Sequence, residues 1–106
     1  MKSIPERDWK RIRDLKDELL NVACEQIFQR IEKLSADRAG QQHKTYLELY
    51  KLVQKEDDKI AKMFNDLKRS NAFFKIAALR LYGVLTDAQM GLFSEETQAI
   101  VKTFAS

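Results

Sequence analysis

The sequence predicts an all-α protein, in which a long antiparallel helical hairpin is followed by shorter C-terminal helices that complete a three- or four-helix bundle. Three observations predict it. The 106 residues include only three Gly and one Pro, so few positions interrupt a helix. Apolar residues recur at three- and four-residue steps over two long segments, which is the pattern of amphipathic helices. No segment alternates apolar and polar residues in the way that half-buried strands do.

The first helix is expected to open at Ser3 and to run to the region of residues 35–40. Glu6 follows Ser3 by three residues, the spacing of a capping box, and Pro5 suits the first turn. Its apolar positions are Trp9, Ile12, Leu15, Leu19, Leu20, Ala23, Ile27, Ile31 and Leu34, widened by Val22, Cys24 and Phe28. Together they occupy well over half of the helix circumference, so we expect this helix to be covered from two directions.

The second helix is expected to extend from about Gln42 to Arg69. Its apolar positions are Tyr46, Leu49, Tyr50, Val53, Ile60, Ala61, Phe64 and Leu67. At 1.5 Å per residue, each of the two helices would be about 40 Å long. A compact chain of this size has a radius of gyration of only about 13 Å. The two helices therefore predict an elongated hairpin.

The remaining residues are expected to form shorter helices. The phase of the apolar residues shifts at Ser70 and Asn71, both favoured N-caps, which predicts a break or kink there. Gly83 suits a left-handed helix C-cap. Thr86 and Ser94 are each placed to cap a further helical segment.

Length and composition indicate one domain over residues 1–106, with 44% apolar and 33% charged residues. Cys24 is the sole cysteine, so no intramolecular disulfide is possible. The N-terminus lacks the apolar run of a signal peptide. No stretch approaches the roughly 20 apolar residues of a membrane span. We expect a cytoplasmic protein without membrane contact.

Asp57 is the most unusual position of the second helix, because it falls among the apolar residues, four after Val53 and three before Ile60. A carboxylate buried there has to be paired or protonated. One interpretation is an ion pair that fixes the register of the two helices. The other is a polar pocket between helices. The residues of this pocket or buried polar network would be Asp57, Tyr46, Tyr50, Asn71, Arg13 and Lys16.

The sequence offers no catalytic group, cofactor site or metal site. His43, the only histidine, stands beside Gln41 and Gln42 with no evident partner for acid–base chemistry. One histidine with scattered carboxylates is not a metal-ligand set. No glycine-rich phosphate loop or nucleophile elbow is present. We expect a protein that is not an enzyme.

The main functional hypothesis is a helical protein–protein interaction module or small regulatory adaptor. The broad apolar surface of the first helix predicts association, either as a homodimer or with another helical protein. The expected interface residues are Leu20, Cys24, Phe28 and Ile31. One alternative is weak binding of nucleic-acid phosphates by the basic residues Lys62, Lys68, Arg69, Lys75 and Arg80. A second alternative is small-molecule binding in the pocket around Asp57.

Overall fold

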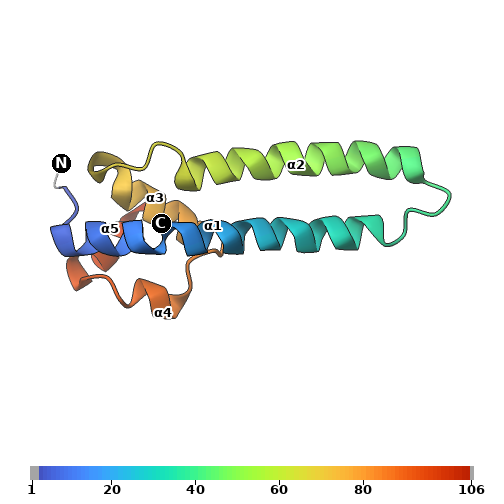
Figure 1. Cartoon of the computed structure of the whole chain (residues 1–106). Coiled ribbons are helices and arrows are strands. Elements are labelled where there is room, and N and C mark those ends of the chain that lie inside the picture. Colours follow the sequence, from blue (N-terminus) through green and yellow to red (C-terminus); the bar gives the residue numbers. More distant parts are fainter. Residues whose placement is uncertain (1–2, 106) are drawn as a thin grey trace.

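The computed structural model describes residues 3–105, and over this range the chain folds entirely as helices and connecting loops (Figure 1). The predicted all-α class is confirmed. The elements are α1 (Glu6–Ser35), α2 (Gln42–Phe64), the 3₁₀ helix η1 (Arg69–Asn71), α3 (Ala72–Leu81), α4 (Asp87–Met90) and α5 (Glu95–Ala105).

The two long helices form the antiparallel hairpin that the sequence predicts, and the short helices gather at one end of it (Figure 1). The molecule measures 54 × 25 × 24 Å, with a radius of gyration of 16.5 Å. That radius exceeds the roughly 13 Å of a compact chain of this length. The excess arises because the far half of the hairpin projects beyond the rest of the protein.

The core lies at the end where the short helices gather, and α3 is at its centre. α3 packs against α1, α2 and α5, and seven of its ten residues are buried. From the long helices, Ile12, Leu19 and Ala23 of α1 and Met63 and Phe64 of α2 join this core. None of these five belongs to the last twelve residues of α1 or to the first twenty-one of α2. The far half of the hairpin therefore contributes no buried apolar side chain to the core.

The start of α1 differs from the prediction, because no Ser3–Glu6 capping box forms. The helix begins at Glu6. The residue before it, Pro5, has an extended backbone with a ψ of 145°, and no side chain caps the N-terminus of the helix. The carboxylate of Glu6 is instead 2.7 Å from the guanidinium of Arg69. The proline therefore sets the helix start one turn after Ser3, where the hydroxyl cannot reach the first free amides.

The end of α2 also differs, because the helix stops at Phe64 and not at Arg69. Asn65 is extended and Asp66 has a φ of 56°, a left-handed conformation that aspartate tolerates better than most residues. The side chain of Asn71 holds the resulting link: its Nδ2 donates to the Asp66 carbonyl at 2.7 Å, and its Oδ1 accepts from the Lys68 amide at 3.0 Å. The break predicted at Ser70 and Asn71 is present, as η1 leading directly into α3.

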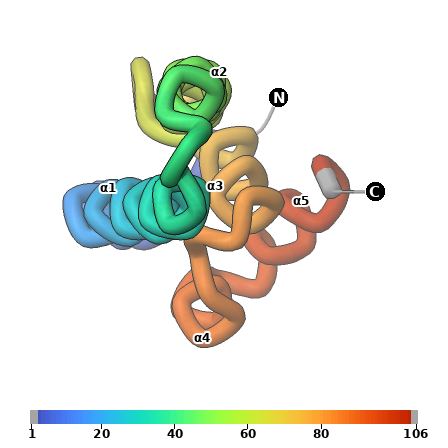
Figure 2. Tube along the Cα trace, turned by 90° about the vertical axis from the view of Figure 1, so that its right-hand side faces the viewer, coloured from blue at the N-terminus to red at the C-terminus, as the bar shows by residue number. Residues whose placement is uncertain are grey.

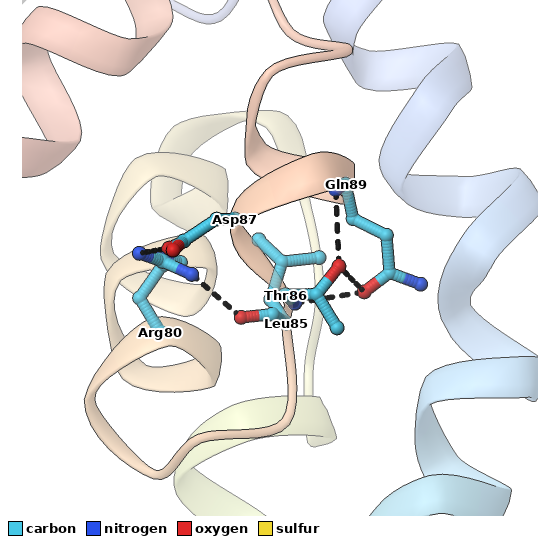
Figure 3. A network of polar contacts seen from close by, with 5 residues as sticks. All are labelled: Arg80, Leu85, Thr86, Asp87 and Gln89. Carbon is cyan, nitrogen blue, oxygen red and sulfur yellow. Dashed lines mark hydrogen bonds and ion pairs between the residues drawn. The ribbon is translucent and has the colours of Figure 1, made fainter.

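The predicted caps of the C-terminal helices are confirmed. Gly83 has a φ of 70° and its amide donates to the Arg80 carbonyl, while the Val84 amide donates to that of Leu79. These two bonds make a Schellman motif at the end of α3. Thr86 forms a capping box with Gln89 at the start of α4 (Figure 3).

The turn between α3 and α4 is held from both sides. The guanidinium of Arg80 donates to the Leu85 carbonyl at 2.8 Å and to the carboxylate of Asp87, which begins α4 (Figure 3). Val84 and Leu85, inside the turn, are buried in the core. The turn is therefore fixed by main-chain, side-chain and apolar contacts together, and it holds the last residues of α3 in place.

Candidate interaction surfaces

One side of the hairpin is bare and carries large apolar side chains. α1 and α2 meet along Ile27 and Leu34 of the first helix and Leu49 and Leu52 of the second, all half-buried. At 100° per residue, Phe28 lies about a quarter turn from this line of contact, and so do residues 46, 50 and 53 of α2. Because the helices run in opposite directions, these quarter turns lead to the same side of the hairpin.

The opposite side of the hairpin is the one that the C-terminal helices cover. Gln26 Nε2 donates to the Gly83 carbonyl at 3.1 Å, and Lys59 Nζ lies 5.4 Å from the centre of the Tyr82 ring. Viewed along the hairpin, α3 and α5 lie on this covered side, while α4 lies beyond α1, on the side of α1 that faces away from α2 (Figure 2). The bare side is the surface that we call the hairpin face. Its residues are Leu20, Cys24, Phe28 and Ile31 of α1 and Tyr46, Tyr50 and Val53 of α2.

The four residues expected at an interface therefore lie on the hairpin face, with unequal exposure. Phe28 is 59% exposed. Cys24 and Ile31 are half-buried, and Leu20 packs partly against the core. The sequence did not single out the contribution of α2, where Tyr46 and Tyr50 are 62% and 57% exposed. The exposed apolar surface is thus shared by both helices of the hairpin.

The predicted pocket around Asp57 is not present. Asp57 is exposed, and Tyr46 and Tyr50 belong to the hairpin face instead of lining a cavity with it. Asn71 is committed to the link between α2 and α3. Arg13 lies 5.9 Å from the centre of the Trp9 ring. The structure does not bring these side chains together.

Lys16, the last residue of the predicted network, is half-buried between α1 and the core. It borders a very small hollow with the buried apolar residues Ile12, Phe64 and Leu79. A long lysine side chain can cover apolar surface with its methylene groups while its ammonium reaches water. Lys16 therefore shields the core and is not a partner of Asp57.

The buried carboxylate of α2 is Glu56, the neighbour of Asp57. Its side chain bonds Arg30 of α1 and lies 3.3 Å from Lys59 Nζ. These three groups line a hollow of about 210 Å³ beside Tyr82 and Val84. The predicted inter-helix ion pair thus exists one residue earlier, because the buried line of α2 runs through Leu49, Leu52 and Glu56 and not through Val53.

The basic region of residues 62–80 is largely occupied by contacts within the chain. Lys75 is buried, and its Nζ donates to the carbonyls of Ala61 and Lys62. Arg69 binds Glu6 and stacks near Trp9, at 5.8 Å from the ring centre. Two further contacts are Lys68 with Asp66 and Arg80 with Asp87. Four of the five basic groups expected to contact phosphates are therefore already paired.

A buried carboxylate that sequence reasoning missed joins the two ends of the fold. Asp8, with no exposed surface, accepts hydrogen bonds from the Ser94 amide at 3.0 Å, from the Ser94 hydroxyl and from the Thr97 hydroxyl. Burial opposes its ionisation. The hydrogen bonds from Ser94 and Thr97, with the nearby Arg7 guanidinium, outweigh that effect and lower the pKa of Asp8. Its role is to anchor the start of α5 on the start of α1.

A second apolar surface, also missed, lies between α3 and α5. Ala77 and Ala78 form the floor of a trough bordered by the exposed side chains of Phe74, Leu81 and Phe104. Two adjoining hollows of about 460 and 280 Å³ make up the trough. The signal for it was the composition of α3, whose apolar residues surround the whole helix and need covering on every side.

Within residues 3–105, no cluster of three or more histidine, cysteine or acidic side chains is placed to bind a metal ion. None of the described helices combines the length and the apolar character needed to cross a membrane.

Comparison with known proteins gives no match, since no family model, curated protein or solved structure is significantly similar to this chain.

Proposed function

We propose that this protein is a helical interaction module that forms a homodimer through the hairpin face. The observation that supports the proposal is the exposure of Phe28, Tyr46 and Tyr50 on the side of the hairpin that no other helix of residues 3–105 covers. Aromatic side chains are enriched at protein interfaces, where they bury much area at low cost in conformational entropy. Two bare helices projecting from a core are also poorly stabilised alone.

A second copy of the chain suits the hairpin face because its seven residues include no Asp, Glu, Lys, Arg or His, so two copies can bury these side chains against each other without enclosing an acidic or basic group. Asp57, at its inner edge, is exposed and can remain in water at the rim. Two hairpins packed in this way form a four-helix arrangement, in which each helix gains the cover that it lacks in the monomer.

Sedimentation equilibrium over a range of protein concentrations tests the proposal. The expected mass rises from 12.4 kDa toward twice that value as the concentration increases. Phe28→Glu or Tyr50→Glu places a charge in the proposed contact and is expected to keep the protein monomeric. A protein that remains a monomer at millimolar concentration contradicts the proposal.

Leu92→Glu is the matched control, because Leu92 is 43% exposed but lies between α4 and α5, away from the hairpin face. It introduces the same charge without touching the proposed interface, so this variant is expected to dimerise as the unmodified protein does. If it dissociates equally, association does not depend on the hairpin face.

The thiol of Cys24 provides a second readout, because this half-buried residue belongs to the hairpin face. Its reaction with a maleimide reagent is expected to slow as the protein concentration rises, and to stay fast in Phe28→Glu. A rate that does not change with concentration would place the dimer contact elsewhere.

A further inference from the structure

The trough between α3 and α5 has the features of a docking surface for a single helix. Leu81 is 73% exposed and Phe74 is 50% exposed, although both belong to the helix at the centre of the core. The rings of Phe74 and Phe104 meet edge to face, with centroids 6.2 Å apart. Exposed apolar side chains grouped around a hollow commonly mark an interaction site.

The dimensions of the trough fit about two turns of a bound helix. α5 runs antiparallel to α3, since Phe74 meets Phe104 while Leu81 and Gln98 line one hollow together. From Phe74 to Leu81 the floor is about 10 Å long at 1.5 Å per residue. The small side chains of Ala77 and Ala78 leave depth for the large side chains of a partner, spaced three and four residues apart.

The charges around the trough select the kind of helix. Lys62 of α2 borders one hollow and Lys102 of α5 borders the other, and both are exposed. Arg80 also lines the trough but is bound to Asp87. Among the residues lining the two hollows there is no carboxylate. A partner with acidic residues on both sides of its apolar stripe complements this arrangement.

A second copy of the trough is a poor occupant. Pairing two troughs face to face would bring Lys62 and Lys102 of one copy toward the same lysines of the other, which is unfavourable.

We infer that the trough formed by Phe74, Ala77, Ala78, Leu81 and Phe104 binds an amphipathic helix of another protein, with carboxylates flanking its apolar stripe. This site is separate from the hairpin face, so one molecule can self-associate through one surface and hold a partner at the other. The inference does not depend on the proposed dimer.

Binding is tested with two fluorescein-labelled, 16-residue helical peptides, each with leucines along one stripe. The first carries Glu on both flanks of the stripe and the second carries Lys at the same positions. Fluorescence anisotropy is measured with the Phe28→Glu protein, so that failure of the trough and failure of the dimer are distinguishable. The acidic peptide is expected to bind at least about tenfold more tightly than the basic one, with a difference that shrinks at high salt.

Variants of the protein locate the site. Leu81→Glu is expected to weaken binding of the acidic peptide by about tenfold or more. A few apolar anchor residues carry most of the binding energy at such interfaces, and this change replaces one of them with a charge. Leu92→Glu, with the same charge at an exposed leucine outside the trough, is expected to change nothing. In the double variant Lys62→Glu, Lys102→Glu the preference is expected to reverse toward the basic peptide, a result that mere misfolding would not produce.

Four results would overturn the inference. Neither peptide binding at millimolar concentration would show that the trough does not dock a helix. Equal binding of both peptides would refute the charge argument. Binding that persists in Leu81→Glu would place the contact elsewhere. A Leu81→Glu protein that loses self-association would identify a second copy as the occupant.

Discussion

Asp8 connects two segments at opposite ends of the chain, and both oxygens of its carboxylate accept hydrogen bonds in doing so. Oδ1 receives the Ser94 amide, and Oδ2 receives the hydroxyls of Ser94 and Thr97. Thr97 has no exposed surface, and its amide in turn donates to the Ser94 hydroxyl at 3.3 Å. The N-terminus of α5 is thereby capped by a serine whose own position depends on a charge contributed by α1.

Asp8→Asn is expected to lower the free energy of unfolding by about 1–3 kcal/mol, because the neutral amide loses the charge that strengthens these hydrogen bonds and its NH₂ group cannot accept from the Ser94 amide or from either hydroxyl. Urea denaturation measures the change. Asp14→Asn, at an exposed aspartate of the same helix, is the control and should alter stability by less than about 0.5 kcal/mol.

The lowered pKa of Asp8 also predicts a dependence of stability on pH. A carboxyl whose pKa is lower in the folded than in the unfolded state stabilises the fold above its ordinary pKa, near pH 4. This contribution is lost as the pH falls through the lower, folded value. Between pH 6 and pH 3, the unmodified protein should therefore lose more stability than Asp8→Asn. Parallel curves for the two proteins would contradict the assignment.

At the residue scale, the sequence predicted the kind of buried group better than its position. The second helix does bury a carboxylate against a base of the first, but the residue is Glu56 and not Asp57. The apolar arc of α2 includes both its contact line with α1 and the exposed residues of the hairpin face. Its centre therefore lies to one side of the buried line. A periodic pattern gives the middle of an apolar arc, and it does not tell which part of the arc another helix covers.

At the scale of elements, the end of α2 depends on a residue of α3. The last carbonyls of a helix have no partner within it, and the buried ammonium of Lys75 lies 3.3 and 2.9 Å from those of Ala61 and Lys62. A cation at this position also opposes the negative end of the helix dipole. The apolar periodicity does not predict the stop at Phe64, because Lys75, which bonds the last carbonyls of α2, is supplied by the following helix.

Lys75→Met keeps the length of the side chain while removing both hydrogen bonds and the charge. The expected loss of stability is about 1–3 kcal/mol, since the partly buried carbonyls of Ala61 and Lys62 each lose the hydrogen bond from the ammonium. Thermal unfolding monitored by circular dichroism measures it. Lys55→Met, at an exposed position of α2, is expected to leave the melting temperature nearly unchanged. Equal effects of the two variants would show that Lys75 only solvates the surface.

At the scale of the whole molecule, stability is expected to decrease along the hairpin. The end near α3 is held by the core and by the contacts of Lys75 and Gly83. The far end, around the loop of residues 36–41, has only the contact between α1 and α2. Segments with few buried apolar contacts open at lower free energy than the core.

Hydrogen exchange measures this gradient. In dilute protein, the amides of residues 28–35 and 42–53 are expected to exchange faster than those of α3. At higher concentration the same amides should become protected as a second copy covers the hairpin face, whereas in Phe28→Glu they should remain fast. Uniform protection along both long helices of a monomer would contradict the gradient.

The elongated shape followed from the sequence because two long amphipathic segments cannot fit within a compact chain of this size. The position of the C-terminal helices did not follow. Their attachment depends on Asp8 and on the covering of α3, contacts between residues far apart in the sequence, and helical periodicity carries no information about such pairs. The trough could not be predicted for the same reason, because its walls come from three separate segments of the chain, α2, α3 and α5.

The bond between Asp8 and Ser94 spans 86 residues of the chain, which has a kinetic consequence. Closing so long a loop has a high entropic cost, so this contact is expected to form only after the local hairpin and α3 are in place. An interaction absent from the folding transition state affects the unfolding rate alone. In stopped-flow experiments, Asp8→Asn should therefore unfold faster than the unmodified protein while refolding at the same rate.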